Sequence, residues 1–390
     1  MQRSLAWYNQ QSAISLKMES DDCMTVSNTK HKMGKGRKII LIVLLAVAFI
    51  IAGTILFRVI YREALRSKHA IKTPNGIDLM ETVRIGDIQQ ALYFRGQNTD
   101  NPVILYLHGW PAATEMQFLH GFQYEWEHDF TVVHWDQRQA GKTFLANNPD
   151  EVGAVTFERL LEDAWEVTQY IQNKLGKEKI ILLGHSGGTI LGTALVQSHP
   201  QAFSAYIGVG QVTNYMENDR IGYNLVLEKA REAGHTKDIA ELESLGSYLT
   251  DPYDASVFTR MGQVRRYQDK YGVGTGVDMN VMLLALSSPY YSFRETLVLF
   301  GNVWEYQIEL FRYAYTEYDA ESLGTEYAMP VFYVQGENDF LTTQGISFID
   351  KIEAPDKRLF YIPEAGHMTM MNHPKEFARV LLEEIAPLIP

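Results

Sequence analysis

The stretch that decides the fold runs from Lys179 to Thr189 and reads KIILLGHSGGT. Its first half, KIILL, is a short continuous apolar run, which is typical of a β-strand buried on both faces. Its second half turns and opens a helix. In that turn Ser186 has Gly184 two residues before it and Gly188 two residues after it. So tight a turn needs tiny residues at those two positions, and it lifts the serine hydroxyl above the sheet. The stretch therefore predicts Ser186 as a nucleophile, with the Gly187 amide at the helix N-terminus as a donor to an oxyanion.

Strands and helices alternate on both sides of this stretch. Residues 79–84 and 90–95 predict an antiparallel hairpin. Further buried strands are predicted at 102–107, 130–135, 179–183, 205–209, 330–334 and 358–362, with helices at 156–175, 184–199, 343–352 and 374–385. This alternation predicts an α/β fold with a mostly parallel sheet covered on both faces.

The pattern changes between Gln211 and about Ala328. Polar helical segments and many aromatic residues fill this part of the chain, and no buried strand run is evident. We expect a helical cap over 211–328, inserted between a first core part (71–210) and a second core part (329–390). Because sites of open α/β sheets lie at the carboxyl ends of the strands, the cap is expected to act as a lid there.

A serine nucleophile needs a base to take its proton, and the base needs an acid to orient it. Two downstream strands end in suitable residues, at Gly336-Glu-Asn-Asp339 and Pro363-Glu-Ala-Gly-His367. Asp339 is preferred over Glu337, because three residues after Gly336 let the chain turn back over the sheet. His367 is preferred over His373, because His373 directly precedes Pro374 and is expected to open the last helix.

The second oxyanion donor is expected in the loop after the strand 102–107, which reads His108-Gly-Trp-Pro111. The amide of Trp110 is the candidate, because Gly109 permits the backbone to turn there. His108 is interpreted as a buried structural residue.

Five motifs of this sequence together resemble those of a known enzyme superfamily. HGWP (108–111), DQRQAGKT (136–143), GHSGGT (184–189), GENDF (336–340) and GHMTMMNHP (366–374) resemble the α/β-hydrolase superfamily. DQRQAGKT resembles the proline iminopeptidase-like branch, whose usual pattern is DQR-G-x-G-x-S. The resemblance spans about 75–390. It implies a catalytic triad of Ser186, Asp339 and His367, an oxyanion hole of the Trp110 and Gly187 amides, and structural roles for Asp136 and Arg138.

The resemblance implies a serine hydrolase that works by acyl transfer, and most directly an aminopeptidase that cleaves N-terminal peptide or amide bonds. A carboxylesterase or lipase is the alternative, and a non-catalytic binding scaffold is an alternative of another class. Epoxide and haloalkane chemistry are disfavoured, because those enzymes use an aspartate nucleophile. Candidates for holding a free amine are the cap residues Glu217, Glu228, Glu295, Glu305 and Glu309. No cofactor or metal is implied, and a single cysteine, Cys23, excludes a cysteine-built zinc site.

The N-terminal part predicts attachment to a membrane. The chain carries a net charge of −12, which argues against a nucleic-acid partner. Residues 1–38 form a basic tail that is expected to be disordered, and Ile39–Phe57 is an uncharged apolar run long enough to span a membrane. A transmembrane anchor over 39–61 is preferred to a buried core helix or a cleaved signal peptide. Five Lys or Arg before the run against four after it favour a cytoplasmic N-terminus and an extracellular catalytic domain.

Overall fold

The structure is a computed structural model that describes residues 35–110, 112–246, 256–274, 276–299 and 301–390. The tail predicted to be disordered therefore lies outside the described residues, apart from 35–38. The chain divides into two units, Met1–Phe57 and Arg58–Pro390.

The first unit contributes most of one long helix, α1 (Lys35–Lys68), which includes the predicted span 39–61. No residue of α1 is buried. Its length and composition suit a membrane crossing, and they suit a signal sequence equally well.

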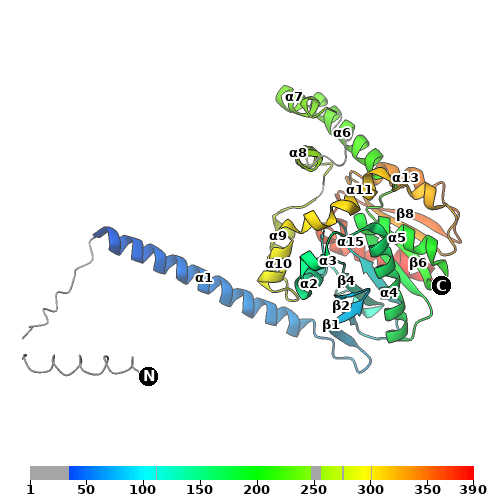
Figure 1. Cartoon of the computed structure of the whole chain (residues 1–390), viewed down its shortest axis with the longest axis horizontal. Helices are drawn as coiled ribbons and strands as arrows, with labels where there is room; N and C mark the ends of the chain where they lie inside the picture. Colours follow the sequence, from blue (N-terminus) through cyan, green and yellow to red (C-terminus); the bar gives the residue numbers. More distant parts are fainter. Residues whose placement is uncertain (1–34, 111, 247–255, 275, 300) are drawn as a thin grey trace, which may run out of the picture. The chain divides into compact units, whose positions relative to one another are not determined.

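The second unit holds an eight-stranded sheet, in the order β1-β2-β4-β3-β5-β6-β7-β8 (Figure 1). Its strands are β1 (Ile77–Ile85), β2 (Ile88–Gly96), β3 (Val103–Leu107), β4 (Thr131–Asp136), β5 (Ile180–His185), β6 (Phe203–Val209), β7 (Val331–Gly336) and β8 (Lys357–Ile362). β2 pairs antiparallel with β1 and with β4, and every pair from β4 to β8 is parallel. The predicted hairpin and the mostly parallel sheet are confirmed.

The helices of the core are α2 (Gly141–Ala146), α3 (Pro149–Val152), α4 (Phe157–Leu175), α5 (Gly187–Ser198), α13 (Thr342–Ile349), α14 (Thr369–Asn372) and α15 (Pro374–Arg379). Short 3-10 turns lie at Leu119–Gly121, Trp126–His128, Pro200–Ala202 and Ala386–Leu388. The helix expected over 374–385 is α15 followed by a π-helical turn, Val380–Ile385.

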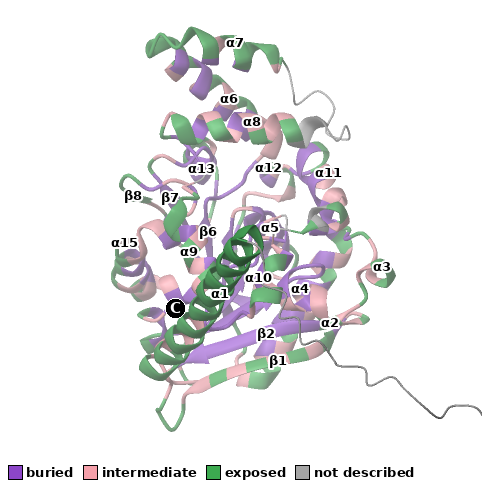
Figure 2. Cartoon of the chain, turned by 90° about the vertical axis from the view of Figure 1, so that its left-hand side faces the viewer, coloured by how far each residue is buried: buried purple, intermediate pink, exposed green. Residues whose placement is uncertain are grey.

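Side chains alternate between two apolar layers along the central strands, because successive residues of a strand point to opposite faces. On β3, Leu105 and Leu107 join a layer with α4, α5 and α13, whereas Ile104 and Tyr106 join a layer with α15 and the turns at 119–128. Figure 2 shows β2 largely buried and α7 (Thr236–Ser244) largely exposed. Burial on both faces explains why the central strands are continuous apolar runs.

Between β6 and β7 the described residues form helices and turns, as the cap prediction expects. These helices are α6 (Tyr215–Glu232), α7, α8 (Ser256–Lys270), α9 (Met279–Ser287), α10 (Phe293–Val298), α11 (Ile308–Thr316) and α12 (Ala320–Leu323), with a 3-10 stretch at Asn302–Gln307. Helices α6, α7 and α8 enclose a small apolar cluster of their own, around Val226 and Leu242. The boundaries 71–210, 211–328 and 329–390 stay predictions.

Candidate active site

Ser186 lies in the turn between β5 and α5, in a strained backbone conformation. Its φ of +54° falls in a region that residues other than glycine rarely adopt. A Cβ on Gly184 would lie 2.7 Å from the carbonyl oxygen of Gly188, and a Cβ on Gly188 would lie 2.2 Å from that of Leu107. Larger residues at either position would force this turn apart. The Ser186 N–H donates to the Val209 carbonyl at 3.0 Å, which joins the turn to β6.

Asp339 and His367 lie in the loops after β7 and β8, and the structure brings them together. His367 Nδ1 donates to Asp339 Oδ2 at 2.9 Å, and Asp339 Oδ1 accepts the N–H of Leu341 at 3.0 Å. Both side chains are buried. A carboxylate on Nδ1 holds the proton on that nitrogen, and Nε2 is then able to accept a proton.

The two less favoured residues lie apart from this pair. Glu337 is exposed, and its carboxylate accepts the N–H of Glu364 at 3.0 Å. His373 occupies the N-cap position of α15, where its side chain makes no capping hydrogen bond. Neither side chain takes part in the contact between Asp339 and His367.

Two contacts hold Ser186 and His367 at the same edge of the sheet. Gly210, at the end of β6, has a φ of +57°, and a Cβ there would lie 2.9 Å from His367 Cε1. His185, next to the serine, has its Nε2 3.0 Å from the His367 carbonyl oxygen. Within the described residues the Ser186 hydroxyl makes no hydrogen bond to His367. Such bonds are often long in substrate-free sites and tighten when substrate binds.

The loop that carries Trp110 lies against the serine. A Cβ on Gly109 would lie 3.5 Å from Ser186 Oγ, and a Cβ on Gly187 would lie 2.9 Å from the Trp110 backbone nitrogen. The Trp110 indole donates to Gln137 Oε1 at 3.0 Å, which fixes the ring. The two predicted oxyanion donors are therefore close neighbours beside Ser186.

His108 is buried and neutral in this arrangement, in keeping with its structural interpretation. Its Nδ1 donates to the Gly109 carbonyl at 2.8 Å, and its Nε2 accepts the N–H of Gln137 at 3.2 Å. Burial lowers the pKa of His108. Gln137 also donates from Nε2 to the His108 carbonyl at 3.0 Å, so it braces the whole loop.

A buried ion pair that the sequence analysis missed lies directly behind the site. Glu115 accepts hydrogen bonds from the Tyr106 hydroxyl and from His185 Nδ1, the latter at 2.5 Å. Both nitrogens of His185 face oxygen acceptors, Glu115 and the His367 carbonyl, so both carry protons. Burial disfavours the positive charge of His185 and would lower its pKa. The interaction with the Glu115 carboxylate outweighs this effect, so the pKa of His185 is raised. His185 stands inside the GHSGG motif, yet nothing in the sequence connects it with a partner 70 residues away.

Asp136 and Arg138 tie the following loop to the core and the cap. The buried Asp136 accepts hydrogen bonds from Thr114, from the Tyr291 hydroxyl and from the Lys142 N–H, and burial raises its pKa. Arg138 pairs with Asp163 at 2.7 Å. These contacts agree with the structural roles that the resemblance implies.

The cap glutamates proposed as amine ligands are exposed or already paired. Glu228 and Glu305 are exposed. Glu217 pairs with Arg220, Glu295 with Lys142 at 2.7 Å, and Glu309 with Arg312 at 2.6 Å.

A fully buried cap carboxylate is instead Asp219 on α6, which the sequence analysis did not single out. It pairs with Arg265 of α8 and accepts the Tyr315 hydroxyl at 2.8 Å. The Arg265 guanidinium lies 3.9 Å from the centre of the Phe340 ring, which is 5.0 Å from the His367 ring. This series of contacts links the cap to the candidate histidine.

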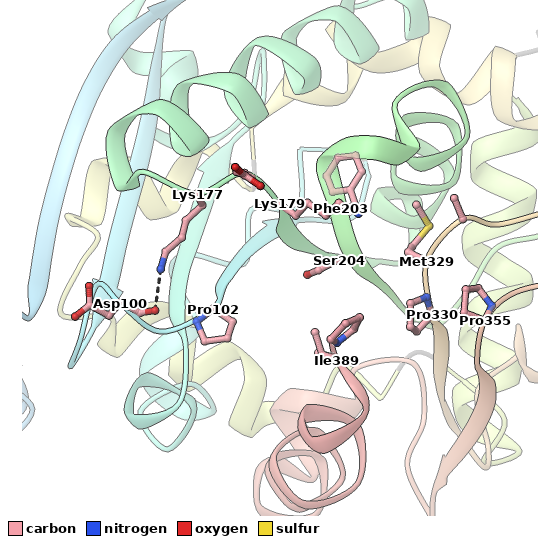
Figure 3. A pocket seen from close by; sticks show the side chains of 13 residues that line it. Asp100, Pro102, Lys177, Lys179, Phe203, Ser204, Met329, Pro330, Pro355 and Ile389 are labelled. Carbon is pink, nitrogen blue, oxygen red and sulfur yellow. Dashed lines mark hydrogen bonds between the residues drawn. The ribbon is translucent and has the colours of Figure 1, made fainter.

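A surface pocket of about 490 Å³ lies at the opposite end of the sheet. Pro102, Lys179, Phe203 and Pro330, at the amino ends of four parallel strands, line it together with Ile389 (Figure 3). It contains none of the candidate catalytic residues. Among the described side chains, no group of three or more His, Cys, Asp or Glu is arranged to hold a metal ion.

Comparisons with known proteins agree with this fold. Residues 102–374 match the family model of the α/β hydrolase fold. The chain is 26% identical over 324 residues to a probable aminopeptidase of Bacillus subtilis (strain 168), with 80% of this chain and 97% of the relative covered.

Solved structures share the fold. A proline iminopeptidase-related protein from Thermus thermophilus is 20% identical, with 80% of this chain and 99% of that chain covered and a TM-score of 0.54. A bacterial membrane phospholipase A is 14% identical, with coverages of 88% and 96% and a TM-score of 0.54. The family match covers well over half of the chain, and the sheet order and the strained serine turn fit it. The chain therefore belongs to the α/β-hydrolase fold family, in which it resembles the proline iminopeptidase-like branch.

Proposed function

We propose that this chain is a serine hydrolase that forms an acyl-enzyme. Ser186 Oγ attacks a substrate carbonyl while His367 Nε2 takes its proton, and the Trp110 and Gly187 amides donate to the oxyanion of the tetrahedral intermediate. The proton on His367 passes to the leaving amine or alcohol. Water then attacks the acyl-enzyme with His367 as base, and Ser186 is regenerated. The observation that carries this proposal is the hydrogen bond between Asp339 and His367 at the sheet edge where Ser186 turns.

Covalent labelling separates this mechanism from a non-catalytic scaffold. A fluorophosphonate probe should label the purified chain, and Ser186→Ala should remove the label. Absence of labelling in a folded, undenatured sample would favour the binding scaffold.

The preferred substrate is an N-terminal peptide or amide bond. The resemblance to the proline iminopeptidase-like branch and the probable aminopeptidase among the relatives support this choice. An aminopeptidase must bind a free α-amine, so hydrolysis of aminoacyl-arylamides should fall sharply when the amine is acetylated. Equal rates on the free and acetylated substrates would refute it.

A carboxylic ester or lipid is the second candidate, and the pairing of the cap carboxylates favours it. Asp219 is neutralised by Arg265, and the glutamates of the cap are exposed or paired with cations. A bound ammonium group would have to displace one of these cations or bind one of the exposed glutamates. Parallel assays on short-chain p-nitrophenyl esters and aminoacyl-arylamides distinguish the two candidates.

The proposed location is a membrane, with 39–61 as an uncleaved anchor, a cytoplasmic N-terminus and an extracellular catalytic domain. The apolar composition of α1 and the basic residues before it support this arrangement. Protease added to intact spheroplasts should digest the catalytic domain and spare the N-terminal tail. Protection of the catalytic domain until lysis would reverse the orientation.

A further inference from the structure

Helix α9 carries apolar residues on its outward side as well as on its buried side. Its nine residues, MNVMLLALS, contain no charge. Val281 and Ala285 pack into the core, whereas Met279, Leu283 and Leu286 are 71%, 54% and 40% exposed. The exposed three follow each other at the spacing of one helix face. A helix with one face in water normally carries polar residues there, so an apolar face indicates a non-aqueous neighbour.

The next helix extends this apolar surface. On α10, Phe293 and Leu297 are one turn apart, and they are 55% and 47% exposed. Helices α9 and α10 contact each other and follow in sequence, as Figure 1 shows. We call Met279, Leu283, Leu286, Phe293 and Leu297 the α9–α10 surface.

The turn between these two helices is bound by the first residues of the second unit. Arg58 donates to the Tyr291 carbonyl at 3.1 Å, and Arg62 donates to the Pro289 carbonyl at 2.9 Å. The Arg58 guanidinium also lies 5.8 Å from the centre of the Phe293 ring. Arg58 directly follows Phe57, the last residue of the apolar run. The end of the apolar run is therefore one residue away from a group that contacts the α9–α10 surface.

We propose that the α9–α10 surface inserts into the lipid interface of the membrane that holds the N-terminal anchor. The proposal rests on that anchor and is independent of the catalytic mechanism. An uncharged apolar face beside arginines is the composition of interfacial membrane-binding segments, since the cations meet the lipid phosphates. Arg58, Arg62 and the exposed Arg294 supply these cations. The covalent anchor also keeps the surface at a high local concentration next to lipid.

This location would bring the membrane close to the candidate active site. The residues that lead into α9 are bonded to the loop of the candidate base: the His367 N–H donates to the Gly274 carbonyl at 3.3 Å, and Asn372 donates to the Gly276 carbonyl at 2.7 Å. A lipid-facing α9 would let the site receive amphiphilic substrates whose apolar part stays in the bilayer.

Site-specific fluorescence in the full chain tests the proposal. In a Cys23→Ser background, single cysteines are introduced by Leu283→Cys, by Lys237→Cys on the exposed α7, and by Val47→Cys in the apolar run. Each is labelled with a nitrobenzoxadiazole dye and reconstituted into phosphatidylcholine–phosphatidylglycerol vesicles, with and without doxyl-labelled phosphatidylcholine. We expect a blue shift and about a twofold or larger loss of fluorescence to the doxyl lipid at positions 283 and 47, and neither at 237.

The outcomes separate the possible occupants of the surface. Quenching at 47 without quenching at 283 overturns the proposal and keeps the anchor, whereas no quenching at 47 removes the anchor and the proposal together. A blue shift at position 283 without quenching by the doxyl lipid also overturns the proposal. If that shift disappears as the lipid-to-protein ratio rises, a second copy covers the surface; if it persists, another part of the same chain does. Quenching at 283 that is independent of the lipid-to-protein ratio supports the proposal.

Discussion

Glu115→Gln replaces one buried oxygen by an amide nitrogen and keeps the volume of the side chain. It removes the charge that faces His185 and weakens the hydrogen bond from Tyr106. The carboxylate accepts two hydrogen bonds, each charge-assisted and worth about 1.5–3 kcal/mol. Removing one partner of a buried pair costs about 3–5 kcal/mol, because the other charge is left without compensation. We expect a loss of unfolding free energy of about this size at pH 6.

The pH dependence of that loss follows from the two pKa shifts. The pKa of His185 is raised from 6.5 in the folded chain, so its share of the stabilisation is complete below pH 6.5 and is lost as pH rises through the folded-state pKa. Burial disfavours the Glu115 carboxylate, but His185 outweighs this and lowers its pKa from 4.5, so its share is lost as pH falls through that lowered pKa. The pair is therefore most stabilising between pH 4.5 and 6.5. The difference between the parent chain and Glu115→Gln should shrink as pH rises above 6.5.

Urea unfolding of the detergent-solubilised chain, followed by tryptophan fluorescence across this pH range, measures both effects. Glu127→Gln is the matched control, because Glu127 is a buried carboxylate that pairs with Arg95 at 2.7 Å and contacts no residue of the site. Both variants should lose stability, but only Glu115→Gln should lower kcat, since His185 contacts the His367 carbonyl. Because burial raises the pKa of Glu127, Glu127→Gln also changes the pH slope of stability, and kcat is the measurement that separates the two variants. A loss below about 1 kcal/mol, or parallel pH curves for parent and variant, would refute the buried ion pair.

Four further outcomes are expected. Ser186→Ala should lower turnover by several orders of magnitude without unfolding the chain, and retention of a tenth of the activity would remove it from the nucleophile role. Asp339→Asn should lower kcat by about 10⁴-fold whereas Glu337→Gln stays near parent activity, and kinetic assays showing the opposite order would reassign the acid. Gln139 has a φ of +58° and donates to two backbone carbonyls. Gln139→Ala and Gln139→Gly lose the same hydrogen bonds, but only glycine adopts this φ without strain, so Gln139→Ala should be about 1 kcal/mol less stable in urea unfolding. Equal stabilities of the two variants would contradict this. A chain that starts at Lys68 should be soluble and hydrolyse small chromogenic substrates, and a folded but inactive product would give residues 58–67 a part in the site.

The positions of the candidate residues could be predicted because the residues that follow parallel strands all lie at one edge of the sheet. Strands β5 and β7 are buried along their whole length, so each is an apolar run whose polar successor stands out in the sequence. β8 shows the limit of that argument: Lys357 and Arg358 are exposed within the strand, and its apolar pattern is weaker. The candidate residues Ser186, Asp339 and His367 follow β5, β7 and β8. Their proximity was a consequence of topology and needed no information about side-chain packing.

The supporting contacts could not be predicted in the same way, because they join residues without a shared pattern. Glu115 lies in an irregular loop, and its partner His185 is distant in sequence. In the cap, Asp219 lies on α6 only two residues from the half-exposed Glu217, and it is buried because Arg265 of α8 and Tyr315 of α11 lie over it. A period of 3.6 residues predicts which face of a helix a residue occupies, but α6 packs against α7, α8 and α11 and has no single buried face.

Gln139 shows how structure explains a departure from a family pattern. The proline iminopeptidase-like pattern has glycine at this position, and the structure gives the backbone there a left-handed φ of +58° that suits glycine. A glutamine is tolerated because its Nε2 donates to the Pro149 and Gly153 carbonyls, at 2.9 and 2.8 Å. Those hydrogen bonds fix the loop around α3. Their stabilisation offsets the cost of the strained backbone conformation at Gln139. The departure at Gln139 therefore concerns the stability of a loop, and it carries no argument against the chemistry proposed for Ser186.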